Sequence, residues 1–199
     1  MSTPSKSPLE RRQRRSALIF EIALFPMLAA MMFASKLLME VLPNIHLLGM
    51  FVMLLTVVFR VRALIPIYIY VFIQGLYAGF NMWWIPYLYI WTLLWGITML
   101  IPRNISPKAA CAVYPIVCAL HGFAYGTLYA PAQALMFNMD LEQTLAWIIS
   151  GIPFDIIHGI SNFACGLLIY PLSQLIWRLL RRTPYRYAYK ERNKERTAE

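Results

Sequence analysis

Six long apolar runs, separated by short polar or charged segments, dominate this chain of 199 residues. A membrane-crossing helix needs about 20 mostly apolar residues, because it rises about 1.5 Å per residue through roughly 30 Å of hydrocarbon. Only 14% of the residues are charged, whereas soluble domains carry about 25%. We therefore predict an all-α, polytopic membrane protein with a six-helix transmembrane bundle. Its spans are expected at 17–42, 45–59, 63–80, 84–101, 109–137 and 144–177.

Basic residues gather at the two ends of the chain and in two of the predicted loops. Arg60 and Arg62 follow the second run, and Arg103 and Lys108 lie between the fourth and fifth. The opposite loops carry no Lys or Arg. Because cytoplasmic loops are enriched in these residues, we expect a multi-pass plasma-membrane protein with both termini cytoplasmic. The predicted organisation is a basic N-terminal arm (1–16), a six-span membrane domain (17–177) and a basic tail (178–199).

The first run has an alternative interpretation as a cleaved signal peptide, since it follows basic residues. Glu21 and Pro26 interrupt its apolar stretch. Cleavage would also leave five spans with unbalanced loop charges, so we expect the run to be retained. The net charge of +9 does not indicate nucleic-acid binding, because the basic residues apart from Lys36 lie at the ends and in two loops.

Three polar residues inside the last run are the best indication of function. Asp155, His158 and Asn162 are spaced three and four apart, which places them on one helix face. An ionisable residue within a membrane helix costs about 2.5–3.5 kcal/mol on insertion scales. One interpretation is a hydrogen-bond network between helices. We favour contact with a polar ligand, because three polar side chains on one face exceed what packing requires.

Other segments bring polar or aromatic groups to a similar depth. Counting about 1.5 Å per residue from the cytoplasmic basic residues places these groups in the outer leaflet, which predicts a pocket open to the outside. Lys36 and Glu40 either form an outward ion pair at the interface or turn inward to the ligand. We expect most of the aromatic stretch 81–91 to form an interfacial belt, and His121 to be a packing group. The depth estimate selects Asn44, His46, Trp84, Tyr129, Asp155, His158 and Asn162.

Small residues at helical spacing predict close helix contacts. Ala30 and Ala34 are four apart in the first run, and Gly122 and Gly126 begin a longer stripe in the fifth. The fifth helix is therefore expected to pack inside the bundle. The first helix either uses its stripe internally or presents it to another membrane protein.

Several motifs for chemistry are absent from the sequence. There is no nucleotide-binding G-x-x-x-x-G-K-S/T, no H-E-x-x-H, no paired Cys/His spacing and no G-x-S-x-G. The two halves show no inverted repeat, which argues against a self-sufficient secondary transporter. We predict no enzyme, no catalytic residue, no cofactor and no metal site, since His46, Glu40, Asp155 and His158 lack a recognised metal-ligand spacing.

The chain combines six predicted spans, cytoplasmic termini, an outward polar pocket and a small-residue pair on the first helix, without a nucleotide-binding motif. In this combination it resembles an S component, the substrate-capture subunit of an energy-coupling factor (ECF) importer. The resemblance covers nearly all of 17–180 and is carried by residues 30–34 (Ala-Met-Met-Phe-Ala), 43–46 (Pro-Asn-Ile-His) and 151–159. It implies high-affinity capture of a vitamin or micronutrient. It also implies that Ala30 and Ala34 dock on a membrane-coupling subunit served by two ATPase subunits. The resemblance also implies a binding region formed by the loop after the first helix and by helices four to six. Tyr125 lies in this region and therefore joins the candidate site.

The expected ligand is zwitterionic or heteroaromatic, because both charge signs and aromatic rings surround the predicted pocket. Two other functions remain open. A membrane-embedded enzyme would use Asp155, His158 and Glu40 as acid and base groups. A stand-alone proton-coupled carrier would use Asp155 and His158 as its relay.

Overall fold

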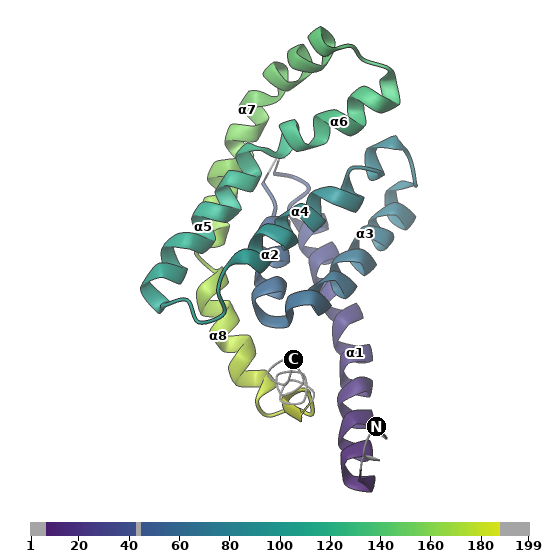
Figure 1. The fold of residues 1–199 in the computed structure, drawn as a ribbon. Helices are drawn as coiled ribbons and strands as arrows, with labels where there is room; N and C mark the ends of the chain where they lie inside the picture. Colours follow the sequence, from purple (N-terminus) through teal and green to yellow (C-terminus); the bar gives the residue numbers. More distant parts are fainter. Residues whose placement is uncertain (1–6, 43–44, 188–199) are drawn as a thin grey trace, which may run out of the picture.

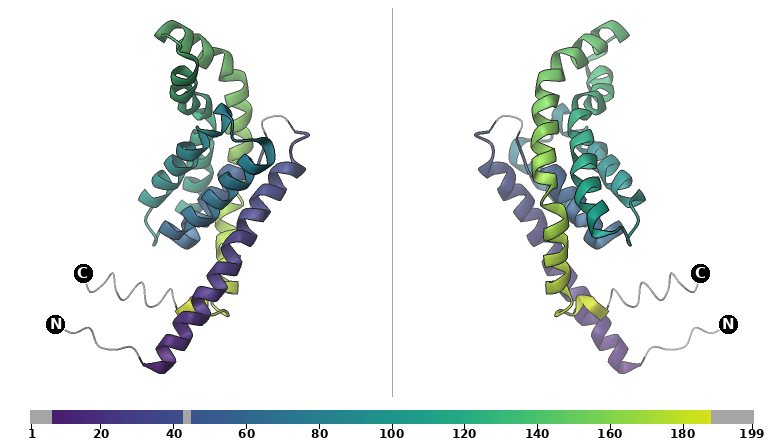
Figure 2. Two further views of the ribbon diagram at one scale, coloured as in Figure 1. Left: turned by 90° about the vertical axis from the view of Figure 1, so that its right-hand side faces the viewer. Right: turned by 90° about the vertical axis from the view of Figure 1, so that its left-hand side faces the viewer.

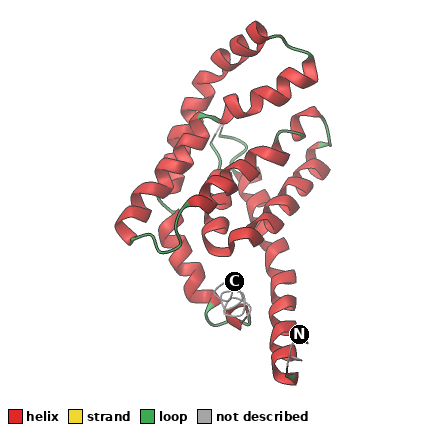
Figure 3. Ribbon diagram, viewed as in Figure 1, coloured by secondary structure: helices red, strands yellow, loops and turns green. Residues whose placement is uncertain are grey.

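The computed structural model describes residues 7–42 and 45–187, and every regular element in these ranges is helical (Figure 3). This confirms the all-α prediction. The elements in chain order are α1 (Pro8–Leu38), α2 (Leu48–Phe59), the 3-10 helix η1 (Arg60–Ala63), α3 (Leu64–Ala78), the 3-10 helix η2 (Met82–Trp84), α4 (Tyr87–Leu100), α5 (Pro107–Phe123), α6 (Tyr125–Phe137), α7 (Leu141–Gly166) and α8 (Ile169–Leu180).

Within residues 7–42 and 45–187, four helical stretches are long and apolar enough to cross a membrane. They are Pro8–Leu38, Leu48–Ala78, Pro107–Phe137 and Leu141–Gly166. The second contains α2, η1 and α3, and the third contains α5 and α6. The prediction of a membrane protein with several apolar helices is therefore confirmed. α4 has 14 residues and α8 has 12, so neither alone reaches the length of about 20 residues that a bilayer requires.

α2 forms the centre of the molecule (Figure 1). Ten of its 12 residues are buried, because α4, α5 and α8 pack around it. α1 packs against α3, and α5 packs along α7. A helix that is apolar on all sides, as α2 is, must be surrounded by protein or lipid. Burial among the other helices satisfies that requirement here.

Capping residues set where three helices begin. Ser7 and Glu10 form a capping box at the start of α1, with Pro8 as its first residue. The helix thus starts inside the segment that we predicted as a basic arm (1–16). Ser106 caps α5, and Asp140 forms a second capping box at the start of α7. Each side chain accepts a backbone N–H that the first helical turn leaves without a partner.

The break within the third long helical stretch and the break after the fourth do not coincide with the prolines that these stretches contain. Pro115, Pro131 and Pro153 lie inside continuous helices. The chain instead breaks at Ala124, between α5 and α6, and at 167–168, between α7 and α8. Pro171 lies in the first turn of α8, where its missing N–H costs no helical hydrogen bond.

The fifth predicted span does pack inside the molecule through its glycines. A Cβ added at Gly122 would lie 2.7 Å from the carbonyl oxygen of His158. A Cβ at Gly126 would lie 2.5 Å from Asp155 Oδ2. The two glycines therefore permit the close approach of α5 and α6 to α7. Gly151, in contrast, has nothing within 4 Å of its added Cβ.

The start of α1 and the end of α8 lie at the same end of the molecule (Figure 2). A cavity of about 490 Å³ there is lined both by the first turns of α1 and by residues 183–187. The loops that carry Arg60, Arg62 and Arg103 face the same way (Figure 1), and we call this the basic end. Near it, Arg62 forms an ion pair with the buried carboxylate of Glu21, which joins η1 to α1.

Candidate functional site

Two residues of the polar stripe on α7 bond to the backbone of neighbouring helices. The Gly126 N–H donates to both carboxylate oxygens of Asp155, at 2.9 and 3.1 Å. Asn162 Nδ2 donates to the Cys118 carbonyl at 3.3 Å. Asp155 and Asn162 are buried. The interpretation as a hydrogen-bond network between helices therefore accounts for the contacts of both side chains.

Asp155 acts as a cap supplied by another helix. α6 begins directly after the break at Ala124, and that residue provides no side-chain cap. The Asp155 carboxylate reaches across from α7 to the N–H of Gly126, in the first turn of α6. Anionic groups are stabilised near a helix N-terminus because of the helix dipole and the unpaired N–H groups. The break between α5 and α6 and the acidic residue on α7 are thus one structural unit.

His158 belongs to a cluster of aromatic and imidazole rings. Its ring centroid lies 5.1 Å from that of His46 and 5.0 Å from that of Tyr125. The ring centroid of Trp91 lies 6.1 Å from that of Tyr125 and 6.3 Å from that of His46, so these four rings form a closed circle of contacts. His121 packs 5.8 Å from Trp91 and 6.3 Å from Tyr125. We call these five rings the histidine–aromatic cluster, and five different segments contribute to it.

Four polar atoms of this cluster lack protein partners. The Nδ1 atoms of His46, His121 and His158 are buried without a hydrogen bond, as is Trp91 Nε1. Asn162 Oδ1, next to the cluster on α7, is also buried without a hydrogen-bond partner. Buried polar groups in proteins are nearly always hydrogen-bonded, because an unmade bond costs about 1–3 kcal/mol. Five such atoms around one group of rings indicate a place where a polar ligand or ordered water supplies the partners.

Of these rings, His46 lies outside the membrane-spanning stretches, in the loop before α2. Burial, reinforced by the nearby His158, His121 and Lys36, lowers the pKa of His46 to about 4. His46 is therefore neutral at physiological pH. A neutral imidazole has one donor and one acceptor nitrogen, so this side of the cluster suits a ligand with matched donor and acceptor groups.

Other predicted site residues have partners within the protein. Trp84 Nε1 donates to the Val71 carbonyl at 2.8 Å, and the Tyr129 hydroxyl donates to the Trp83 carbonyl at 3.1 Å. Lys36 and Glu40 form an ion pair at 3.8 Å, with side chains 23% and 57% exposed. This matches the interpretation as an interfacial pair, although Lys36 lies close enough to His46 to influence it electrostatically. Asn44 lies outside the described residues.

Sequence reasoning missed two members of the cluster. Trp91 was not singled out from the stretch 81–91, most of which we expected to form an interfacial belt, and it is buried. His121 was expected to be a packing group; its Nε2 does lie 3.3 Å from the Ile90 carbonyl, but Nδ1 has no partner. No local spacing marks either residue as a member, because both reach the cluster through the packing of α4 and α5 in the whole fold.

The small-residue stripe of α1 points away from the protein. Ala30 and Ala34 are exposed. The buried residues of α1, among them Phe25, Ala29 and Met32, lie on the opposite face of the helix. Of the two uses that the sequence left open for this stripe, the structure thus excludes contact with the other described helices.

Among the residues that the structure describes, no three His, Cys, Asp or Glu side chains gather closely enough to hold a metal ion. No protein-family model, curated protein or solved structure matches this chain. Function is therefore argued from the site itself.

Proposed function

We propose that this protein is the substrate-capture subunit of an ECF-type importer in the plasma membrane. It binds a vitamin or other micronutrient with high affinity. A membrane-coupling subunit and two ATPase subunits, all separate chains, supply the energy for transport. In this proposal the chain crosses the bilayer six times, along α1, α2, α3, α4, α5 with α6, and α7 with α8. Both termini are cytoplasmic, at the basic end.

The observation that carries this proposal is the set of unpartnered polar atoms in the histidine–aromatic cluster. A packing site without a ligand would be more stable with apolar groups at these positions, because each unpaired atom is costly. Retaining three histidines and a tryptophan indole there is expected if binding requires them.

The same cluster supports a flat heteroaromatic substrate. His46, His158, Tyr125 and Trp91 form a closed circuit of rings, and aromatic faces favour stacking on a planar ligand. Their nitrogen atoms supply donors and acceptors at the ring edges. Together these features suit a small ring system with polar edges, as in many vitamins.

The exposed Ala30 and Ala34 support a membrane partner. Small residues allow the backbones of two helices to approach closely within lipid, and this face of α1 is not covered by the described part of the chain. The docking surface and the histidine–aromatic cluster involve different helices, so capture and docking can be tested separately.

Ligand retention tests the capture role. Native mass spectrometry of gently purified protein should show one small molecule bound per chain. His158→Phe keeps a ring of similar shape but removes the nitrogen atoms, so it should lose the ligand. In the absence of ligand, this variant should unfold at an equal or higher temperature than the parent chain. The matched control is Trp84→Phe, which removes a bonded indole and should lower stability yet keep the ligand. Full retention of ligand by His158→Phe would contradict the assignment.

Co-purification tests the docking role. The intact chain should isolate together with a membrane-coupling protein and two ATPases. Ala30→Trp and Ala34→Trp should abolish that association, because an indole keeps the two helices apart. Ala112→Trp is the control, since Ala112 is an exposed alanine on another helix. A functional chain that never associates with such proteins would overturn the proposal.

One observation favours a proton-coupled carrier as a second candidate. The rings of His46 and His158 are in contact, and buried histidines in membrane proteins can relay protons. Liposomes that contain only this chain would then take up substrate under a pH gradient. The capture-subunit proposal expects no uptake without the partner proteins.

A further inference from the structure

A second cavity lies at the basic end, next to the last residues of α2, whereas His46 of the histidine–aromatic cluster precedes the first residue of that helix. It has a volume of about 160 Å³ and lies among α2, α4, α5 and α8. The volume needed to hold one water is about 10–15 Å³, so this space admits a small polar group with several atoms. The cavity shares no lining residue with the cluster, so a ligand bound in it is independent of the proposed function.

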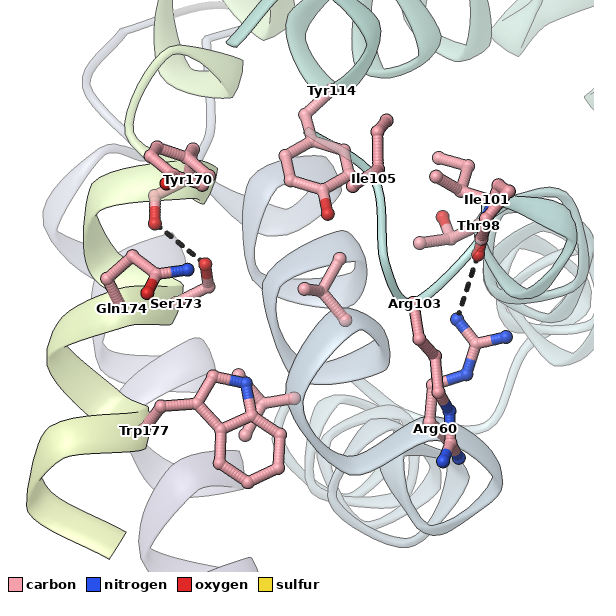
Figure 4. Close-up of a pocket in the computed structure, with 13 residues that line it drawn as sticks. Arg60, Thr98, Ile101, Arg103, Ile105, Tyr114, Tyr170, Ser173, Gln174 and Trp177 are labelled. Carbon is pink, nitrogen blue, oxygen red and sulfur yellow. Dashed lines mark hydrogen bonds between the residues drawn. The ribbon is translucent and has the colours of Figure 1, made fainter. Parts of the chain in front are cut away.

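The lining of this cavity is cationic and rich in hydrogen-bond donors. Arg60 and Arg103 lie on one side, and Tyr170, Gln174 and Trp177 of α8 lie on the opposite side (Figure 4). Tyr114 lies between them at the base, buried and close enough to Arg60 and Tyr170 to interact electrostatically. No Asp or Glu is among the lining residues that the structure describes. The site therefore has the composition of an anion site.

The backbone at Arg60 is strained, and three contacts hold it. Arg60 has φ 57° and ψ −124°, a conformation that glycine adopts readily and other residues rarely do. Its guanidinium donates to the carbonyls of Met99 and Ile101, and its own carbonyl accepts from Trp95 Nε1 at 3.1 Å. Backbone strain persists where the surrounding structure enforces it, and it concentrates at functional positions. Here the strained residue is fixed at the wall of the cavity.

We propose that this cavity binds a phosphate group, as carried by an anionic lipid headgroup or by a small phosphate compound. Guanidinium groups match phosphate oxygens in geometry and charge. Phenol and indole groups add donors, and basic pockets between membrane helices are known to receive anionic lipid headgroups. Arg103 and Gln174 are exposed, so the mouth of the cavity is accessible, whereas Tyr114 closes its base.

The full-length purified chain tests this by equilibrium titration with three probes. These are inorganic phosphate, dihexanoylphosphatidylglycerol and the zwitterionic dihexanoylphosphatidylcholine. Arg103→Gln should weaken binding of the anionic probe about tenfold, as expected when one charge-assisted hydrogen bond is lost. Lys108→Gln is the control, because it removes a nearby positive charge that does not line the cavity.

Each outcome of the titration has one interpretation. Tight binding of phosphatidylglycerol alone identifies a lipid headgroup as the ligand. Binding of inorganic phosphate at equal affinity identifies a soluble phosphate compound. The proposal is overturned if neither probe binds better than phosphatidylcholine. It is also overturned if Arg103→Gln and Lys108→Gln weaken binding equally, since that result would indicate general surface charge.

Discussion

Polar residues inside the apolar helices divide into two groups by what they bond. Asp155 and Asn162 bond to backbone groups of α6 and α5, and Glu21 forms an ion pair with Arg62. These residues hold helices together. The second group consists of atoms without a protein partner, which include Nδ1 of His46 and His158 and also Oδ1 of Asn162, and binding accounts for them better than packing. Bonding, rather than polarity, therefore separates structural residues from candidate ligand contacts.

Replacing Asp155 should show that its carboxylate is a cap. Asp155→Ala leaves the Gly126 N–H buried without an acceptor, so unfolding free energy should fall by about 1–3 kcal/mol. Asp155→Asn keeps an acceptor oxygen and should lose less than about 1 kcal/mol, which reflects the helix dipole alone. Denaturation followed by circular dichroism measures both variants. Equal losses would mean that charge, and not the hydrogen bond, is what matters.

Stability should depend on pH through His46. Its pKa is lowered to about 4 in the folded chain, against about 6.5 in an unfolded one. As pH falls from 6.5 towards 4, only the unfolded state takes up this proton, so stability present above pH 6.5 is progressively lost. His46→Asn should reduce the difference in melting temperature between pH 7.5 and pH 5. Parallel pH profiles for parent and variant would refute a buried, neutral His46.

At the scale of elements, sequence patterns located helices well and breaks poorly. Predicted spans at 63–80 and 84–101 became α3 and α4, shortened by up to three residues at each end. The break at Ala124 has no glycine or proline at its position; a carboxylate 31 residues further along the chain caps the new helix. A contact between residues so far apart in the sequence cannot be predicted from the residues next to the break. The early start of α1, in contrast, was readable from Ser7, Pro8 and Glu10.

The same limit applies to the candidate site. The spacing of Asp155, His158 and Asn162 correctly placed them on one buried face. Helical periodicity says nothing about which rings from other helices meet that face. Trp91 and His121 joined the cluster through the packing of α4 and α5, which depends on the whole fold.

Close packing of α5 against α7 should make Gly122 intolerant of even one methyl group. In Gly122→Ala the new Cβ would lie 2.7 Å from the His158 carbonyl oxygen, so the helices must separate, at a cost of about 1–3 kcal/mol. Gly151→Ala on α7 meets open space and should be neutral or stabilising by up to about 1 kcal/mol, since alanine favours helix. Thermal unfolding of the two variants provides the comparison. Similar melting temperatures would show that the helices are less tightly packed than described.

At the scale of the whole molecule, charge distinguishes the two ends. The basic end holds the start of α1, the end of α8, and the loops with Arg60 and Arg103 (Figures 1 and 2). The opposite end carries the loop with Asp140, between α6 and α7. Such an asymmetry orients membrane proteins with the basic end in the cytoplasm. This asymmetry supports the cytoplasmic placement of the basic end that we propose.

Cysteine labelling in intact cells tests that orientation. In a background with Cys111, Cys118 and Cys165 replaced by alanine, a membrane-impermeant maleimide should label Asp140→Cys directly. Lys108→Cys should react only after the membrane is permeabilised. The reverse order would place the basic end outside and refute the proposed topology.

The hairpin of α6 and α7 is held less firmly than α2, the helix at the centre of the molecule. Only three of the 13 residues of α6 are buried, compared with ten of 12 in α2, and the Asp155 carboxylate fastens its first turn. Segments with little buried surface open locally at low free energy, without global unfolding. Where α6 extends beyond the bilayer, its amide hydrogens should therefore exchange with solvent well before those of α2. A ligand bound at the histidine–aromatic cluster would slow that exchange, so occupancy of the cluster would be visible at the far tip of the protein.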